Sequence, residues 1–227
     1  MKKQGKNFAA AFIGTALEFY DFALFGLLAP VFSKLFFPKE DLIAALIATY
    51  CIFAAGFLIR PLGGIVFGYV GDTFGRKRAM VISIIAMMIP TSLIGFLPGY
   101  AQIGLLAPLI LAACRLLQGL CAGGEFSGAA IFVIEHAHQH RKYFSGSLVT
   151  ASSVVGMLAA SSVASVCALE TMPDWGWRVP FLLSIPIGLL GFYIRKNTQE
   201  TSAFTTAQKS QKNEAPSFTS ILKNNFI

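Results

Sequence analysis

Residues 8–32 read FAAAFIGTALEFYDFALFGLLAPVF, a long apolar stretch that contains two acids, Glu18 and Asp21. A helix needs about 20 predominantly apolar residues to cross the hydrocarbon of a bilayer, so this stretch predicts a membrane-spanning helix. A charge inside hydrocarbon is costly and usually has a partner or a task. The two acids therefore indicate that the first helix does more than anchor the chain.

The rest of the sequence continues this pattern. Hydrophobic residues make up 55% of the 227 residues and charged residues 13%, whereas a soluble domain carries about a quarter charged residues. No stretch alternates with period two, as a barrel strand would. We expect an all-α membrane protein with a six-helix domain at residues 1–195 and a polar cytoplasmic tail or interdomain linker at residues 196–227. The expected helices cover residues 8–33, 42–70, 79–97, 103–134, 145–169 and 178–195.

Lysine and arginine fall unevenly on the two sides of these helices. Thirteen of them, Arg195 included, fall on the side that holds both termini, and three fall on the other side. Because cytoplasmic loops are enriched in these residues, both termini are predicted to be cytoplasmic. The net charge of +7 follows from this asymmetry and suits anionic lipid head groups, so no nucleic acid partner is expected.

Features of enzymes and metal sites are scarce. His136, His138 and His140 are spaced by two, which does not place them on one helical face, and no fourth ligand is evident. The four cysteines lie within apolar stretches without metal-ligand spacing. Nucleophile motifs and phosphate-binding loops are missing. We therefore expect neither an enzyme nor a metal or other cofactor.

Charged and polar residues of the first and fourth predicted helices lie on defined faces. Glu18 and Asp21 are three residues apart and share a face. Arg115, Gln118 and Glu125 follow one stripe of the fourth helix. Asp21 and Arg115 each lie about 18 Å from the outer end of their helix by helical rise. If the two helices are neighbours, Asp21 or Glu18 can pair with Arg115.

The acids within the predicted spans outnumber the bases. Glu18, Asp21 and Glu125 face only Arg60 and Arg115. In a low-dielectric setting the surplus carboxylate could be neutralised by a proton, which is a physical basis for coupling a proton to a solute. The alternative is a fixed buried ion pair that locks the bundle.

The segment between the second and third predicted helices reads GYVGDTFGRKR over residues 68–78. Its glycines permit a tight turn, Asp72 can cap or pair locally, and the basic triplet 76–78 anchors the cytoplasmic face. Glu135, at the end of the fourth helix, should reach the same face and could pair with Arg76. A plain positive-inside anchor would require neither the acid nor the glycines.

This segment resembles the signature loop of the major facilitator superfamily, G-x-x-x-D-[RK]-x-G-[RK]-[RK]-[RK], at every fixed position except Thr73. Further pieces are similar to its metabolite–proton symporter branch, which includes proline/betaine, 2-oxoglutarate, citrate and shikimate carriers. These pieces are EFYDF at 18–22, GFLIRPLGG at 56–64, RLLQG at 115–119, GGE at 123–125 and WGWRVPF at 175–181.

The resemblance implies a secondary active transporter of the bacterial inner membrane, in which the first and fourth helices line a central cavity. It implies symport of a proton with a small polar organic solute, such as a carboxylate or a proline- or betaine-like zwitterion. Symport is favoured because the fifth helix lacks the glycine-proline motif of antiporters. The candidates for substrate and proton coupling are Glu18, Asp21, Arg60, Arg115, Gln118 and Glu125. The candidates for the cytoplasmic gating loop are Gly68, Asp72, Gly75, Arg76, Lys77 and Glu135.

Transporters of this superfamily have two six-helix halves, and this sequence corresponds to the amino-terminal half alone. Their cavity forms between the halves, which rock against each other. We therefore expect the amino-terminal half of such a transporter. The alternative is a truncated remnant that does not transport, or a half-transporter that needs a partner half, either the missing carboxyl-terminal half or a second copy of itself.

Overall fold

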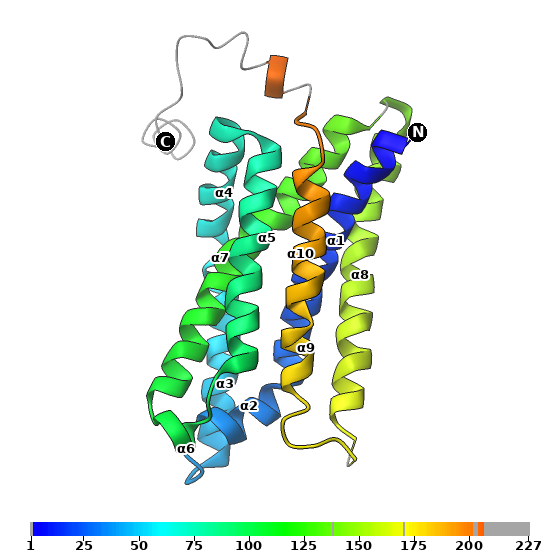
Figure 1. The fold of residues 1–227 in the computed structure, drawn as a ribbon. Coiled ribbons are helices and arrows are strands. Elements are labelled where there is room, and N and C mark those ends of the chain that lie inside the picture. The colour runs from blue at the N-terminus through cyan, green and yellow to red at the C-terminus, as the bar shows by residue number, and fades with distance from the viewer. Residues whose placement is uncertain (1, 138, 170, 202–203, 207–227) are drawn as a thin grey trace.

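The computed structural model describes residues 2–137, 139–169, 171–201 and 204–206, and the predicted all-α fold is confirmed in them. Six helical segments of this described part are long and apolar enough to cross a membrane. They stand side by side as an upright bundle (Figure 1). The start of the first helix and residues 204–206 lie at the same end of the bundle.

The first span consists of α1 and the shorter α2, the second of α3 and α4, and the sixth of α9 and α10. The third, fourth and fifth spans are α5, α7 and α8. The bounds are α1 Lys2–Leu27, α2 Ala29–Phe36, α3 Leu42–Leu58, α4 Arg60–Phe74, α5 Arg76–Phe96, α6 Tyr100–Ile103, α7 Leu106–His136, the 3-10 turn η1 Gln139–Arg141, α8 Lys142–Cys167, α9 Arg178–Leu182 and α10 Ser184–Lys196.

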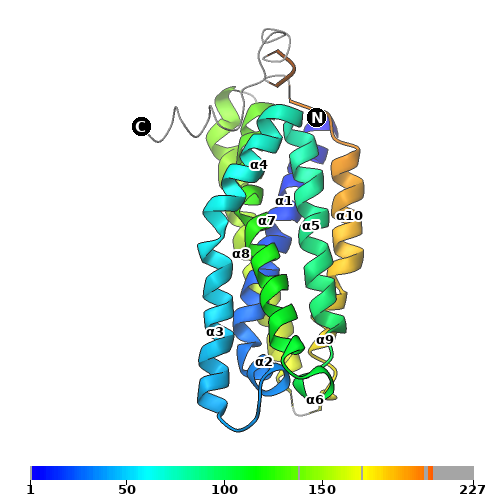
Figure 2. The same cartoon turned by 90° about the vertical axis from the view of Figure 1, so that its left-hand side faces the viewer.

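Three of the spans that the sequence predicts as single helices are broken near prolines. Pro30 lies in the first turn of α2 and Pro61 in the first turn of α4. Pro186 lies near the start of α10. Proline lacks an N–H and is tolerated in a first helical turn, where that N–H would have no helical partner. The breaks are short, and α3 and α4 continue in nearly the same direction (Figure 2).

The predicted loop at residues 68–78 is almost entirely helical. The α4 helix continues to Phe74, α5 begins at Arg76, and Gly75 alone forms the turn with a φ of 106°. Glycine adopts this left-handed backbone without the steric cost of a side chain. The ends predicted from the sequence, residues 70 and 79, are therefore wrong by a few residues. Polar residues beyond the hydrocarbon can stay helical without an apolar pattern.

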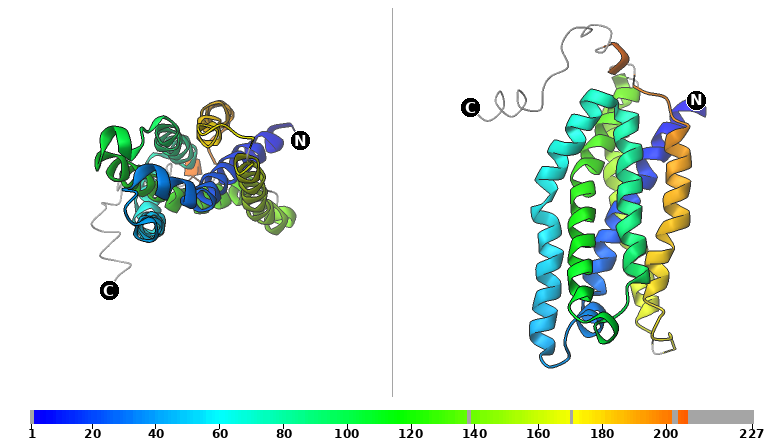
Figure 3. Two further views of the ribbon diagram at one scale, coloured as in Figure 1. Left: turned by 90° about the horizontal axis from the view of Figure 1, so that it is seen from below. Right: turned by 60° about the vertical axis from the view of Figure 1, so that its left-hand side comes forward.

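The α7 helix is the centre of the bundle and packs against α1, α3, α4, α5 and α8. The α1 helix packs along α8, and α10 packs against α5 and α1. The end-on view in Figure 3 shows α8 beside α1. Because α1 and α7 both have neighbours on several sides, polar residues on their facing stripes lie inside the protein.

The α3–α4 span contacts α7 backbone to backbone. A Cβ atom built at Gly119 would overlap the carbonyl group of Gly56, and one at Gly123 would overlap the carbonyl group of Arg60. A Cβ at Gly63 would overlap the Leu120 carbonyl in the same way. Small residues at such positions let membrane helices approach closely, which is a main source of packing energy where water is absent.

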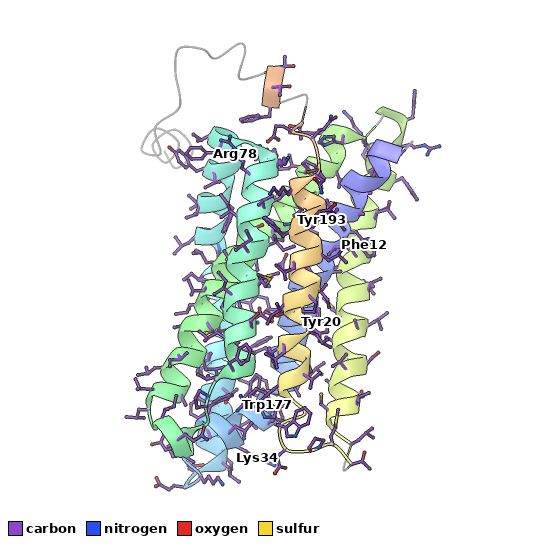
Figure 4. The ribbon with its side chains drawn as sticks, viewed as in Figure 1. Phe12, Tyr20, Lys34, Arg78, Trp177 and Tyr193 are labelled. Carbon is purple, nitrogen blue, oxygen red and sulfur yellow. The ribbon has the colours of Figure 1, made fainter. Side chains whose placement is uncertain are left out.

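Aromatic rings close the end of the bundle opposite the amino terminus. The Trp177 ring lies 5.7 Å from the Phe32 ring and 5.6 Å from the Phe36 ring, centroid to centroid. The neighbouring Arg178 donates a hydrogen bond of 2.9 Å to the Gly95 carbonyl oxygen at the end of α5. Figure 4 shows Trp177 near this end, far from Arg78. The WGWR segment thus joins the first, third and sixth spans.

We expect Gly123→Ala to lower the free energy of unfolding by about 1–3 kcal/mol, because the added methyl group overpacks the α4–α7 contact. The matched control is Gly128→Ala on the same helix. Among the described residues no atom outside the local backbone of α7 and the two chain neighbours lies within 4 Å of the Cβ position at Gly128, so this variant should be neutral or slightly stabilising. Thermal unfolding in detergent checks both variants, and equal effects at the two positions would contradict the packing described here.

Candidate functional site

Acidic and basic residues from α1, α4, α7 and α10 form three ion pairs inside the described bundle. An acid and a base that meet where water is scarce compensate each other's desolvation only when they are close and well placed. The pairs are Glu18 with Arg60, Asp21 with Arg115, and Glu125 with Arg195.

Two of these pairs line one small cavity between α1, α3, α4, α5 and α7. The cavity brings together five of the six residues that the sequence predicts for coupling: Glu18, Asp21, Arg60, Arg115 and Gln118. It lies deep in the bundle, since Figure 4 shows Tyr20, the neighbour of Asp21 in the chain, about midway between Arg78 and Lys34. The predicted pairing of α1 with Arg115 is thus formed by Asp21.

A hydrogen-bonded chain links Arg115 to α5. The Arg115 Nη1 atom lies 3.8 Å from Asp21 Oδ2 and donates a hydrogen bond of 3.3 Å to Gln118 Oε1. Gln118 Nε2 in turn donates to Thr91 Oγ1 at 3.0 Å, and the Thr91 hydroxyl donates to the Met87 carbonyl oxygen at 2.9 Å. Gln118 therefore orients the Arg115 guanidinium and joins α7 to α5.

Phenylalanine rings surround the guanidinium groups of Arg60 and Arg115, with centroid distances of 4.7–4.9 Å. The face of an aromatic ring attracts a cation, and the attraction grows when water is excluded. The sequence analysis missed these rings because phenylalanine in an apolar stretch predicts only packing. The rings are Phe22, which contacts both arginines, Phe25 and Phe53 at Arg115, and Phe57 at Arg60.

Glu125, the sixth predicted coupling residue, belongs to a separate and closed network with Arg195 of α10. Both Glu125 oxygens accept hydrogen bonds from the Arg195 guanidinium, and Oε2 also accepts one from the Ser83 hydroxyl. Arg195 also donates to the carbonyl oxygens of Ala10, at 3.1 Å, and of Met80. The network therefore ties α1, α5, α7 and α10 together.

Arg195 corrects the charge count made from the sequence. The sequence assigns it to the basic cytoplasmic side, which leaves three acids facing two bases, but its side chain is only 1% exposed and forms the third pair. The three acids predicted for coupling thus have one base each, and the predicted surplus acid is absent from this set. The sequence could not reveal this, because Arg195 lies at the end of an apolar stretch, where an arginine can turn outward or inward.

The turn at Gly75 carries its own ion pair. Arg76 Nη2 lies 2.6 Å from Asp72 Oδ1, one helical turn away. The predicted pairing of Arg76 with Glu135 is not formed. Asp72, four residues from Arg76 in the chain, forms the ion pair with its guanidinium group. Of the other predicted gating residues, Gly68 lines a small cavity together with Arg76.

Lys77 contributes its backbone to a contact that the sequence analysis missed. Its N–H donates to both Glu200 oxygens, each at 3.2 Å. A carboxylate at a helix amino terminus satisfies free N–H groups and favours the helix dipole. A Cβ at Gly75 would meet the Glu200 carboxylate. Glu200 lies in the polar segment predicted as a tail or linker, most of which, residues 207–227, is outside the described part of the chain.

The histidines show no metal-binding arrangement in the described residues. His136 Nδ1 lies 2.9 Å from the Phe132 carbonyl oxygen in its own helix. No group of three or more histidine, cysteine, aspartate or glutamate residues in the described ranges is placed to hold a metal ion. His138 is outside the described residues.

Comparison with known proteins gives consistent similarities. Residues 6–225 match the family described as sugar (and other) transporter. The chain is 40% identical over 206 residues to the proline/betaine transporter of Salmonella typhimurium strain LT2, covering 89% of this chain and 41% of that protein. It is 38% identical over 206 residues to the shikimate transporter of Escherichia coli K12, covering 88% of this chain and 47% of that protein.

The fold is similar to that of solved transporter structures. The xylose transporter XylE from E. coli, in a partially occluded inward open conformation, superposes with a TM-score of 0.82 at 18% identity. The match covers 93% of this chain and 52% of XylE. The chain therefore spans about half the length of the curated relatives and of the structure that it matches.

We expect Arg195→Gln to lower the free energy of unfolding by about 3–5 kcal/mol, because it leaves Glu125 buried without its partner. The control is the exposed neighbour Lys196→Gln, which should change stability by no more than about 0.5 kcal/mol. The double variant Glu125→Gln/Arg195→Gln should be more stable than Arg195→Gln alone, as a coupled pair requires. Additive losses in thermal unfolding would show that the two side chains do not interact.

Proposed function

Because the chain belongs to the sugar (and other) transporter family of the major facilitator superfamily, we propose that it forms the amino-terminal half of a secondary active transporter. The observation that carries this proposal is the convergence of the Glu18–Arg60 and Asp21–Arg115 pairs on one intramembrane cavity. Ionisable residues inside a membrane mark substrate and ion pathways. Its activity is transport, and it carries out no enzymatic reaction.

The solute is a small polar organic molecule with a carboxylate, either an organic acid or a zwitterion. Arg115 Nε and Nη2 and Arg60 Nε have no hydrogen-bond partner in the described structure. Buried donors of this kind are costly unless a ligand or water satisfies them, and a guanidinium matches the geometry of a carboxylate. The similar transporters are named for solutes of both kinds: proline and betaine are zwitterions, and shikimate is an organic acid.

A proton accompanies the solute. Glu18 and Asp21 border the same cavity as the two arginines, so a proton bound to either acid changes the field that an anionic solute meets. A complete cavity requires a second six-helix half, since alternating access in such transporters comes from one repeat rocking against the other. That half is the remaining part of the same protein, a separate chain or a second copy.

Uptake measurements test this proposal. The chain is joined to the carboxyl-terminal half of the S. typhimurium proline/betaine transporter and expressed in cells that lack uptake of the solutes. Labelled proline, glycine betaine and shikimate serve as probes. We expect uptake of at least one probe that depends on a proton gradient.

The variant Arg115→Gln should lower this uptake at least about tenfold, because it removes a charge-assisted contact of roughly 1.5–3 kcal/mol. The exposed Arg141→Gln is the matched control and should keep full uptake. Equal uptake by the two variants would contradict the role of the cavity.

We further propose that the chain lies in the bacterial inner membrane with both termini in the cytoplasm, as the uneven distribution of lysine and arginine supports. In a background without the native cysteines, Glu40→Cys should react with a membrane-impermeant maleimide in intact cells. Arg141→Cys, at the other end of the bundle, should react only after the cells are permeabilised. The reverse labelling pattern would exclude this orientation.

A further inference from the structure

The three buried carboxylates differ in how far hydrogen bonds compensate their charge. Glu125 is fully engaged, since Arg195 donates to both of its oxygens and the Ser83 hydroxyl to one of them. Charge-assisted and bidentate bonds of this kind are the strong ones. Glu125 therefore serves as a fixed part of the bundle.

Glu18 stands at the opposite extreme. Neither of its side-chain oxygens has a hydrogen-bond partner in the described structure, although the residue is only 2% exposed. Its ion-pair contact is with Arg60, whose Nη2 lies 3.7 Å from Glu18 Oε1, beyond hydrogen-bond distance. A buried carboxylate without hydrogen bonds is costly in its charged form, and a bound proton removes that cost.

Asp21 lies between these extremes. Its Oδ2 is 3.8 Å from Arg115 Nη1, and its Oδ1 has no hydrogen-bond partner. Arg115 is held in turn by Gln118. The Asp21–Arg115 pair is thus joined to a network across α1, α5 and α7, whereas Glu18 is joined to none.

Among the basic residues near Glu18, only Arg60 has no other acidic partner. The spans α5 and α8 carry no charged side chain between their ends, residues 79–97 and 143–167. Arg115 is engaged by Asp21 and Gln118, and Arg195 is engaged by Glu125, so neither compensates Glu18 directly. The charged residues on the helices around Glu18 are Asp21 on its own helix, Arg60 on α4, Arg115 and Glu125 on α7, and Arg195 on α10.

Arg60 does not depend on Glu18 for its position. Its guanidinium carbon lies 4.7 Å from the ring centroids of both Phe22 and Phe57. Its side chain is 23% exposed, and its Nε has no hydrogen-bond partner. The two rings therefore hold a cation that stays in place, with free donors, when Glu18 is neutral.

We propose that Glu18 binds the transported proton and that its neutralisation frees Arg60 to bind the carboxylate of the solute. This inference rests on the proposed function. The proton comes from hydronium, and the O–H bond forms at a Glu18 oxygen, which raises the charge of the site by one. The solute carboxylate restores the balance at Arg60, so proton and anion enter as a neutral pair. When the anion leaves, the unpaired Arg60 favours the charged form of Glu18, and the proton passes to water.

Infrared spectroscopy of the purified 227-residue chain in lipid tests the proton site without any transport measurement. A protonated carboxyl group has a C=O stretching band that a carboxylate lacks. We expect such a band to appear and vanish with pH, to be lost in Glu18→Gln, and to remain in Asp21→Asn and Glu125→Gln. Loss of the band in Asp21→Asn with retention in Glu18→Gln would overturn the proposal and assign the proton to Asp21.

Two further variants distinguish an effect on proton binding from an effect on folding. Glu18→Gln has the shape of the protonated side chain, so its thermal unfolding should match that of the parent chain, whereas a large loss of stability would overturn the assignment. Arg60→Gln removes the anion site but not the acid, so it should keep the infrared band. A band that disappears in Arg60→Gln would mean that Arg60 creates the proton site, contrary to the proposal.

Uptake by the joined transporter tests the coupling itself. Glu18→Gln should lose uptake driven by a proton gradient, with a fall to background, but should still exchange labelled solute for unlabelled solute across the membrane. Arg60→Gln should lose both activities. Gradient-driven uptake that survives in Glu18→Gln would overturn the proposal. If the parent transporter takes up no probe, the proposed function fails, and the infrared result alone still decides whether Glu18 holds the proton.

Discussion

The absence of water inside the membrane is the constraint on which this structure depends. Glu18, Asp21 and Glu125, which lie deep in the bundle, each need a base nearby, because no solvent is there to compensate their charge. The helices that carry these residues, α1, α4, α7 and α10, are therefore held together by charge as well as by packing. The glycines of α7 make this possible, because they let α3 and α4 approach closely enough for Arg60 to reach Glu18.

Two kinds of ion pair result from this constraint. The Glu125–Arg195 pair is closed, because every guanidinium nitrogen donates a hydrogen bond, either to Glu125 or to a carbonyl oxygen of α1 or α5. The Glu18–Arg60 pair is open, with long contacts and unpaired atoms on both side chains. A closed pair gives rigidity, whereas the open pair is the one that we propose to bind the proton and the solute. One bundle thus contains a fixed clamp, the Glu125–Arg195 pair, and a proposed binding site.

The region around Gly75 shows how a polar segment can contribute structure. Glu200 follows the last span by a few residues, yet its carboxylate satisfies the N–H of Lys77 at the start of α5. The Asp72–Arg76 pair lies at the same turn. The end of the sixth span is therefore joined to the turn between the second and third spans.

The six spans and most residues of the candidate site could be predicted from the order of the amino acids. Membrane thickness sets the length of an apolar helix, and the three- and four-residue spacing of Asp21, Arg115 and Gln118 sets which face each residue occupies. The partners of the charged residues, in contrast, follow from how the helices pack. Arg195 turns inward to Glu125, Arg76 pairs with Asp72 and not with Glu135, and phenylalanine rings enclose two arginines. Helix periodicity is a local property that the order of residues sets. The partner of a charged side chain instead depends on the distances between helices, which the sequence pattern does not specify.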